Sequence, residues 1–276
     1  MLSSKIINYD IFGRYNLKLA ISGKGGVGKT LLAALLANIF AESGHPVIAI
    51  DADPDANLAA TLGFPNPSSI TPVSDMKHLI EERTGTSAGL TSPYFTLNPK
   101  VDDIPEKFAP RLGNIRLMRM GSIKKGGTGC YCPENALLKT LMAHLLLARD
   151  DIVILDMEAG IEHLTRGTAS AVDRLLIVVE PGRRSLETAL NIQKLAQDIG
   201  LNNVAAVGNK IRNVSDKVFL TSNLCGIEFL GFIPYDQAIV DADQAGHSVI
   251  NSSSKLVTAI CEIYRSLTAK AGVIDI

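Results

Sequence analysis

A glycine-rich stretch near the start of the chain constrains the fold more than any other feature. Residues 23–30 read "GKGGVGKT" and directly follow the apolar run "LKLAIS" at 17–22. A short apolar run that ends in glycines is typical of a buried parallel strand, and the pattern of residues 29–43 favours a helix. We therefore expect the chain to begin with a strand, a tight loop and a helix, which together start an α/β fold.

Further apolar runs continue this alternation. The remaining strands are expected at 46–51, 150–156, 174–180, 203–209 and 228–234, and the remaining helices at 133–148, 184–199, 215–223 and about 252–268. Strands that alternate with helices predict a parallel sheet covered on both faces. The expected fold class is thus α/β, with a single doubly wound, mostly parallel sheet of P-loop NTPase type.

Two segments do not follow the alternation. Residues 1–16 carry no motif and are expected to be an N-terminal extension of a P-loop ATPase domain at 17–276. Residues 62–114 hold seven of the twelve prolines and one helix-like piece, and a strand candidate follows at 115–120. Irregular insertions of this length are usually functional, so we expect the insertion to face a partner.

Composition excludes some classes of function. The 276 residues carry a formal net charge of −1, so no bulk electrostatic attraction to nucleic acid or to an anionic membrane is expected. No apolar run reaches the roughly 18 residues needed to span a bilayer, and the N-terminus lacks the order of a signal peptide. We expect a cytoplasmic protein whose four cysteines are thiols or metal ligands rather than disulfides.

The glycine loop predicts a phosphate site. Residues 23–30 fit the pattern G-x-x-x-x-G-K-[ST], in which backbone N–H groups and the following helix N-terminus bind phosphate oxygens. Lys29 is expected to reach the β- and γ-phosphates, and Thr30 to offer its hydroxyl to Mg²⁺. The residues of this loop expected to bind nucleotide are Gly25, Gly26, Val27, Gly28, Lys29, Thr30 and Leu31.

Carboxylates lie where two other expected strands end. Asp51 and Asp53 close the second strand, and Asp156 closes "IVILD" at 152–156. Ligands of open α/β sheets collect at the carboxyl ends of strands, so Asp51 and Asp156 are predicted to join Thr30 around Mg²⁺. Gly160, four residues on, is the predicted γ-phosphate sensor of the switch II segment. The alternative for these aspartates is a role in helix caps and turns.

Two thiols precede another expected helix. Pro133 suits the first position of the helix at 133–148, which places Cys132 at its N-cap and Cys130 in a glycine-rich stretch. A helix N-terminus lowers the pKa of a thiol and favours the thiolate that binds metals. One chain supplies only two such ligands, and the spacing does not choose between Zn²⁺, Ni²⁺ and an iron–sulfur cluster. A buried or redox-active pair is the alternative.

Lys24 carries a more specific resemblance. The stretch "KGGVGKT" at 24–30 resembles the deviant Walker A signature of the superfamily of nitrogenase iron proteins and MinD/ParA ATPases. That resemblance implies an ATP-dependent homodimer in which Lys24 reaches the nucleotide of the partner chain. It also implies that Asp53 orients the attacking water, so Lys24, Lys29 and Asp53 are the expected catalytic residues. Leu31 departs from the superfamily, which often has Thr or Ser there.

The same superfamily suggests where the base binds. Asn209 in "VGNKI" resembles its adenine-contacting Asn, and Pro234 and Tyr235 in "FIPYD" resemble its second base-contacting segment. An Asn that ends a strand is also common for turn reasons alone.

A narrower family is identifiable from the thiol segment. The stretch "GCYCPENALL" at 129–138, the run at 156–189 and "IPYD" resemble the nickel-insertion ATPases of carbon monoxide dehydrogenase and acetyl-CoA synthase maturation, the CooC/AcsF type. The resemblance implies an ATPase that binds Ni²⁺, or Zn²⁺ at the same site, between the Cys130 and Cys132 pairs of two chains. The implied client is apo carbon monoxide dehydrogenase or acetyl-CoA synthase.

Two alternative functions remain. An iron–sulfur-binding ATPase or reductase would use the same thiols, although "DMEAG" at 156–160 lacks the switch II Cys of the nitrogenase iron protein, which argues against an electron carrier of the iron-protein type. The second alternative is a MinD/ParA-like spatial-organisation ATPase, which would need a basic DNA-facing patch or a basic amphipathic C-terminal anchor. The chain ends in "RSLTAKAGVIDI" with only scattered positive charge, so neither nucleic acid nor membrane is expected as a partner.

Overall fold

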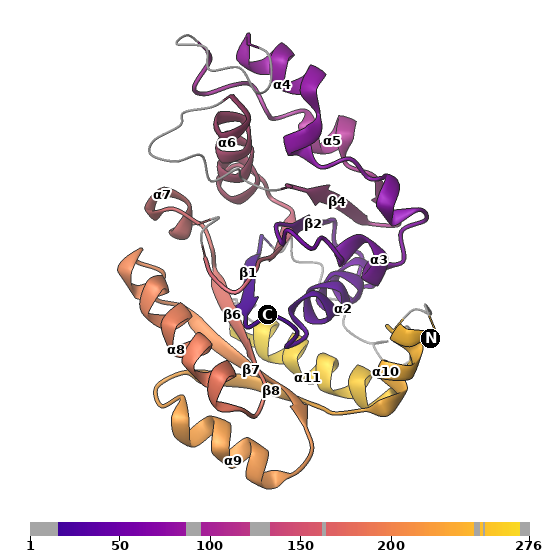
Figure 1. The fold of residues 1–276 in the computed structure, drawn as a ribbon, viewed down its shortest axis with the longest axis vertical. Helices are drawn as coiled ribbons and strands as arrows, with labels where there is room; N and C mark the ends of the chain where they lie inside the picture. Colours follow the sequence, from indigo (N-terminus) through magenta and orange to yellow (C-terminus); the bar gives the residue numbers. More distant parts are fainter. Residues whose placement is uncertain are drawn as a thin grey trace, which may run out of the picture.

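The structure, a computed structural model, describes residues 16–86, 95–121, 133–161, 164–245, 249–250 and 252–270. Within these residues one eight-stranded sheet has the order β3-β4-β2-β5-β1-β6-β7-β8 (Figure 1). The strands are β1 (Lys18–Gly23), β2 (Val47–Asp51), β3 (Arg111–Leu112), β4 (Ile115–Arg119), β5 (Ile152–Asp156), β6 (Arg174–Val179), β7 (Val204–Ile211) and β8 (Glu228–Pro234). Only the β3–β4 pair is antiparallel, which confirms the expected mostly parallel sheet.

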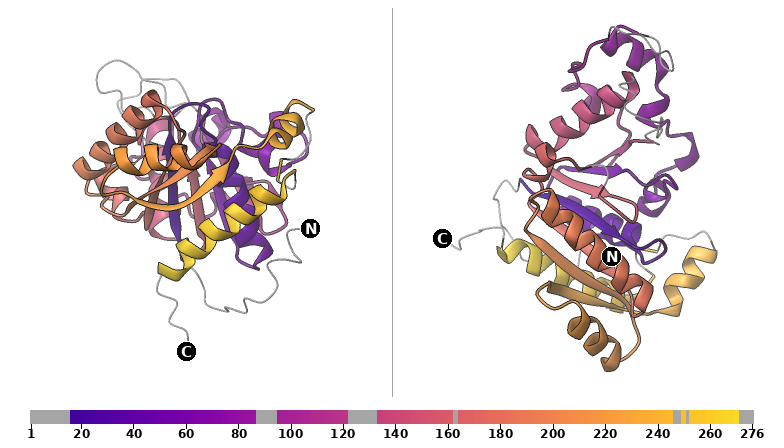
Figure 2. Two further views of the ribbon diagram at one scale, coloured as in Figure 1. Left: turned by 90° about the horizontal axis from the view of Figure 1, so that it is seen from below. Right: turned by 60° about the vertical axis from the view of Figure 1, so that its left-hand side comes forward.

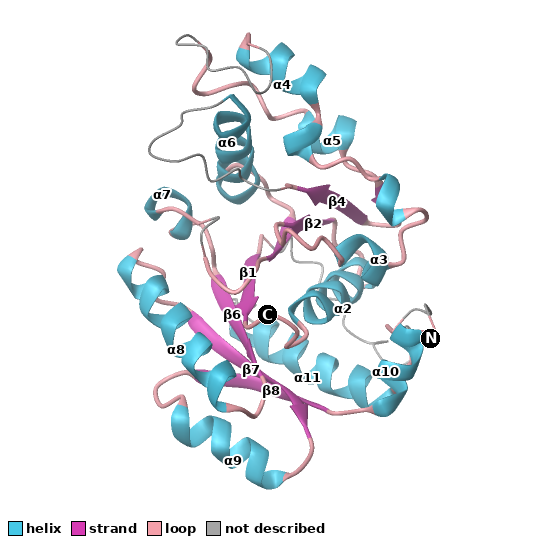
Figure 3. Cartoon of the chain, viewed as in Figure 1, coloured by secondary structure: helices cyan, strands magenta, loops and turns pink. Residues whose placement is uncertain are grey.

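Helices cover both faces of the sheet, as expected (Figures 2 and 3). They are α2 (Lys29–Glu42), α3 (Leu58–Leu62), α4 (Lys77–Thr84), α5 (Ile104–Phe108), α6 (Pro133–Leu147), α7 (Arg166–Ala169), α8 (Arg183–Asp198), α9 (Val214–Asn223), α10 (Gln237–Gln244) and α11 (Ser254–Lys270), with short 3-10 turns at Pro67–Ser69 and Val73–Asp75. Apolar residues of α2, α3 and α11 form one buried cluster, and those of α4, α6, α8 and α9 form the cluster on the opposite face.

The central strands of the sheet read as continuous apolar runs in the sequence. All six residues of β1 and of β6 are buried, because helices pack on both faces of these central strands. Residues 62–114 contribute α4, α5, β3 and the two 3-10 turns, and β4 directly after them pairs with β2. In Figure 1, α4 and α5 lie together beyond α6 at one end of the molecule, away from α8 and α9.

The order of the strands determines where a ligand-binding site can form. Strand β5 lies between β2 and β1, so the carboxyl ends of these three strands are neighbours. Crevices at the carboxyl ends of a doubly wound sheet are the usual place for ligands. Among the described residues, no helix is long and apolar enough to cross a membrane.

Candidate nucleotide-binding site

The loop after β1 has the backbone shape that phosphate binding needs. Gly26 and Gly28 have φ angles of 76° and 97°, in the left-handed region that favours glycine. A Cβ atom on Gly28 would lie 2.3 Å from the Asn209 side-chain amide nitrogen. The loop therefore curls into the start of α2, whose first N–H groups have no partner within the helix. Such a helix terminus is a ready binding site for phosphate.

Lys29 begins α2 and points toward the end of the second strand. Its side chain is only 6% exposed, and its ammonium lies 3.8 Å from a carboxylate oxygen of Asp53. Lys29 and Asp53, 24 positions apart in the chain, thus meet at the carboxyl edge of the sheet. Asp53 also accepts the backbone N–H of Asp55 at 3.0 Å, which holds its carboxylate in the turn after β2.

Two buried carboxyl groups lie side by side beneath this loop. Asp51 and Asp156 are opposite each other in the β2–β5 pairing, and both are almost fully buried. Burial raises the pKa of Asp156 to about 7, an effect that the neighbouring Thr30 hydroxyl opposes. Burial also raises the pKa of Asp51 to about 6, opposed mainly by the hydrogen bond from the Leu58 N–H at 3.1 Å.

These carboxyl groups fit a bound divalent cation. Both side-chain oxygens of Asp156 and one of Asp51 are buried and lack a hydrogen bond of regular geometry. Buried carboxylates without partners are costly, and Mg²⁺ prefers oxygen ligands while keeping several waters. With Thr30 beside Asp156, the residues present therefore suit Mg²⁺, which would neutralise charge on the phosphates of a bound nucleotide.

Ser22 holds the switch II segment, a role that the sequence did not reveal. Its hydroxyl, fully buried at the end of β1, lies 2.9 Å and 2.8 Å from the carbonyl oxygens of Glu158 and Gly160 and donates to them. Gly160, the predicted γ-phosphate sensor, is thereby tied to the residue that directly precedes the phosphate loop. The only sequence signal was a hydroxyl in an otherwise apolar strand end.

A second set of contacts braces the loop from β7. Asn209 is buried and donates from its side chain to the Val27 carbonyl at 2.6 Å, while its side-chain oxygen accepts the Lys210 N–H at 2.8 Å. Lys210 has a φ of 56°, unusual for a residue with a side chain. This bend turns the Lys210 ammonium onto the Gly26 carbonyl at 2.7 Å.

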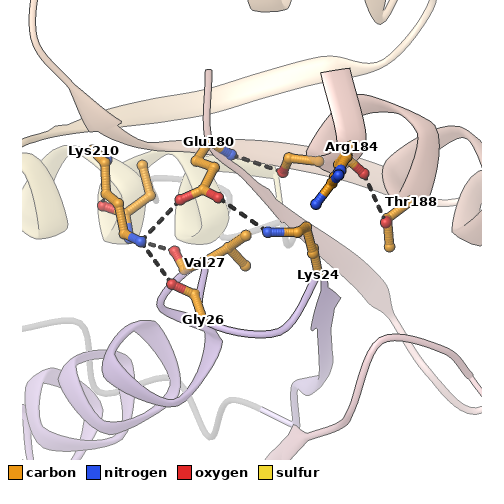
Figure 4. Close-up of polar contacts among 9 residues, drawn as sticks. Lys24, Gly26, Val27, Glu180, Arg184, Thr188 and Lys210 are labelled. Carbon is orange, nitrogen blue, oxygen red and sulfur yellow. Dashed lines mark hydrogen bonds and ion pairs between the residues drawn. The ribbon is translucent and has the colours of Figure 1, made fainter. Parts of the chain in front are cut away.

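Glu180 connects this brace to the signature lysine (Figure 4). Directly after β6, its carboxylate lies 2.9 Å from the Lys210 ammonium and 3.5 Å from the Lys24 ammonium. Sequence reasoning missed both Glu180 and Lys210. Their only signals were a charged residue closing the apolar run "RLLIVV" and a lysine after Asn209.

The expected base-contacting residues lie near the ends of β7 and β8. Pro234 is paired with Ile211, and the Tyr235 N–H donates to the Ile211 carbonyl at 2.9 Å. The Arg212 guanidinium stacks on the Tyr235 ring, 3.9 Å from its centroid. Because β7 and β8 are parallel and Pro234 pairs with Ile211, two residues after Asn209, these residues lie at the same edge of the sheet as the phosphate loop.

The expected metal ligands Cys130 and Cys132 lie outside the described residues. Helix α6 begins at Pro133, as the sequence predicted. Within the described part of the chain, no group of three or more His, Cys, Asp or Glu residues is placed to hold a metal ion.

A glycine loop between a buried strand and a helix, with buried aspartates on the neighbouring strand ends, defines a P-loop nucleotide hydrolase. More narrowly, the chain belongs to the CobQ/CobB/MinD/ParA nucleotide binding domain family, which it matches over residues 18–249. It is an ATPase of the deviant Walker A type.

Two relatives support the narrower resemblance. The chain is 48% identical over 239 residues to the carbon monoxide dehydrogenase accessory protein CooC of Rhodospirillum rubrum, covering 86% of this chain and 90% of that protein. It is 46% identical over 251 residues to an uncharacterized ATP-binding protein of Methanocaldococcus jannaschii, covering 90% and 96%. The expected likeness to the CooC type is thus confirmed.

Solved structures support the fold. The MinC:MinD cell division complex of Aquifex aeolicus matches with a TM-score of 0.64 at 23% identity, over 94% of this chain and 98% of that one. A putative plasmid partition protein of Borrelia burgdorferi, bound to AMPPNP, matches with a TM-score of 0.65 at 16% identity, over 93% and 100%. At these identities the likeness shows the fold alone.

Proposed function

We propose that this chain is a cytoplasmic, ATP-hydrolysing maturation factor that binds nickel and inserts it into apo carbon monoxide dehydrogenase or acetyl-CoA synthase. The observation that carries the proposal is the 48% identity to a carbon monoxide dehydrogenase accessory protein over 86% of the chain. The C-x-C pair directly before α6 supplies the chemistry for metal binding.

The proposed binding and hydrolysis of ATP use the residues described above. Lys29 and the loop N–H groups bind the phosphates, and Thr30, Asp51 and Asp156 surround Mg²⁺. Asp53 orients the attacking water. The remaining proposed contacts are Gly160 with the γ-phosphate and Asn209, Pro234 and Tyr235 with the base.

The metal-binding part of the proposal requires two chains. Lys24 lies in the phosphate loop with 37% of its side chain exposed, so it is available to a partner's nucleotide. Two C-x-C pairs brought together by a two-fold axis would offer four thiolates, a set that suits Ni²⁺ or Zn²⁺. One metal per homodimer is therefore expected.

The topology supports the proposal through the start of α6, which directly follows the C-x-C pair in the sequence and lies at the same edge of the sheet as the phosphate loop. Helix α6 ends at Leu147, and β5 begins at Ile152. The carbonyl of Arg149, in the connection, accepts the ammonium of Lys18 at 2.7 Å, and Lys18 is the first residue of β1. The C-terminus of α6 thus lies at the amino edge of the sheet. Because a crossover helix runs antiparallel to its strands, Pro133 lies toward the opposite, carboxyl edge, where the phosphate loop is.

Anaerobic metal analysis tests the proposal. The protein is loaded with Ni²⁺ or Zn²⁺, with and without ATP, and the bound metal is counted per chain. We expect about one metal per two chains. The double substitution Cys130→Ala and Cys132→Ala should abolish this binding while leaving ATP binding measurable.

The chain provides its own matched control. Cys225 precedes β8 and Cys261 lies in α11, so replacing both with Ala removes the same number of thiols without touching the C-x-C pair. Unchanged metal stoichiometry in the Cys130/Cys132 variant would refute the metal site. A brown preparation with iron and sulfide at these thiols would instead favour the iron–sulfur alternative.

A client assay tests the second half of the proposal. Apo carbon monoxide dehydrogenase is incubated with Ni²⁺, Mg²⁺-ATP and the wild-type chain, and the recovered dehydrogenase activity is measured. We expect activation by the wild type and none by the Cys130/Cys132 variant, whereas the Cys225/Cys261 variant should behave like the wild type.

A further inference from the structure

We propose that Glu180 is a positioning residue for Lys24: it retains the signature lysine on its own chain until a second chain, with its nucleotide, competes for it. This inference rests on the nucleotide-dependent homodimer of the proposed function, whose regulation it specifies. It requires no particular metal at the thiols.

Glu180 is itself firmly placed. Its backbone N–H donates to the Ser185 hydroxyl at 3.1 Å, and Ser185 is buried at the start of α8. The carboxylate therefore projects from a fixed strand end toward the phosphate loop (Figure 4). Its two oxygens go to different lysines, Oε1 to Lys24 and Oε2 to Lys210.

The two lysines differ in how they are held. Lys210 donates to the Gly26 carbonyl at 2.7 Å and lies 2.9 Å from Glu180, so two short contacts fix its ammonium. Lys24 lies 3.5 Å from Glu180, and within the described residues its ammonium has no other partner. Lys24 can therefore leave, while Lys210 keeps Glu180 compensated and the loop anchored.

This asymmetry gives Glu180 a specific effect on assembly. A lysine that must reach a partner's phosphates first has to leave the carboxylate of its own chain. The Lys24 and Glu180 side chains are 37% and 23% exposed, so the contact is partly solvated. Partly solvated ion pairs of this kind change an equilibrium by about two- to five-fold. Glu180 therefore weakens dimerisation modestly and selectively.

The substitution Glu180→Gln tests this directly. It removes the charge but keeps the shape, and the Lys210 hydrogen bond to Gly26 can remain. Sedimentation velocity with Mg²⁺ and AMPPNP should give a dimer dissociation constant about two- to five-fold lower than that of the wild type. AMPPNP affinity at chain concentrations below dimerisation should stay within about two-fold, and the difference in dimerisation should shrink at high salt.

A double-mutant cycle tests whether the Lys24–Glu180 contact exists in the nucleotide-free chain, while the dimer dissociation constant remains the readout that a merely structural role would not move. The free energy of unfolding of the nucleotide-free chain is measured for the wild type, Glu180→Gln, Lys24→Ala and the double variant. We expect the Lys24–Glu180 coupling to change the unfolding equilibrium by about two- to five-fold, and to fade at high salt. Lys210→Met is the contrast, because it should weaken AMPPNP binding without tightening the dimer.

The outcomes separate this inference from the nickel proposal. A zero coupling, or a Glu180→Gln dimer no tighter than the wild type, would overturn the role of Glu180, and so would a wild-type chain that forms no dimer with AMPPNP. If the Cys130/Cys132 variant binds metal like the wild type while Glu180→Gln still tightens the dimer, the nickel proposal fails and the role of Glu180 stands.

Discussion

Asp51 and Asp156 face each other across the β2–β5 pairing, with both carboxyl groups buried beside the phosphate loop. Two acids so close together, with one oxygen of Asp51 and both oxygens of Asp156 lacking a regular hydrogen bond, destabilise the nucleotide-free protein when they are ionised. The two buried carboxylates thus destabilise the cation-free site, and a bound cation would offset this cost.

The first prediction concerns pH. Because the folded-state pKa of Asp156 is raised to about 7, the folded chain binds more protons than the unfolded chain between about pH 4 and pH 7. The contribution of Asp156 to the free energy of unfolding is therefore greatest below pH 4 and falls as the pH rises to about 7. Asp156→Asn should remove this dependence and stabilise the nucleotide-free chain at pH 8 by about 2 kcal/mol.

Urea unfolding from pH 5 to pH 8, without Mg²⁺ or nucleotide, measures this effect. Asp198→Asn is the control, because Asp198 is exposed at the end of α8 and should leave the pH profile unchanged. A wild-type chain and an Asp156→Asn variant with parallel pH profiles would contradict the prediction.

The second prediction separates chemistry from binding at Asp53. Asp53→Asn should lower kcat for ATP hydrolysis by about 100-fold, because the residue that we propose to orient the attacking water loses its charge. The dissociation constant for ATP should change only a few-fold, since Lys29 and the loop N–H groups remain. Steady-state phosphate release and fluorescent nucleotide titration give the two values. Asp55→Asn, an exposed carboxylate in the same turn, should change neither, and equal losses in both variants would argue against the assignment.

The third prediction concerns the shape of the phosphate loop. Gly28→Ala should destabilise the chain by about 2 kcal/mol, because Gly28 has a φ of 97° and a Cβ would lie 2.3 Å from the Asn209 amide nitrogen. Gly25→Ala is the matched control for stability, since a Cβ there meets nothing within 4 Å. Urea unfolding compares the two, and similar losses in both would show that the brace from Asn209 is unimportant.

The fourth prediction concerns Ser22. Ser22→Ala removes the hydroxyl that the Glu158 and Gly160 carbonyls accept, so stability should fall by about 1 kcal/mol. Amide hydrogen exchange should become faster in residues 157–161 and stay unchanged in β7. Uniformly faster exchange throughout the sheet would instead indicate a general loss of stability.

The sequence predicted the sheet because its strands are buried on both faces and read as continuous apolar runs. Local patterns also placed Lys29, Asp51 and Asp156 correctly at strand and helix ends. Helix α10 was not expected, although it lies directly after the motif containing Tyr235. Its eight residues form barely two turns, too short a segment for periodicity to predict a helix.

Contacts between distant segments could not be predicted. Glu180, Lys210 and Gly26 meet only because β6 lies between β1 and β7 in the sheet, and no local pattern encodes the pairing of β1 with β6 over about 150 residues. The same holds for Ser22 and the switch II carbonyls. The resemblance to a family supplied motif residues, whereas these braces became visible only in the folded chain.

The position of β5 between β1 and β2 also determines when the site can form during synthesis. Strands β1 and β2 leave the ribosome early, but they are not neighbours, and both pair with β5, about a hundred residues later. In a nascent chain that ends before Ile152, both edges of β1 and one edge of β2 therefore lack a partner strand. Parallel pairing over such distances is slow and leaves intermediates prone to aggregation, so the growing chain is most exposed to aggregation before β5 inserts.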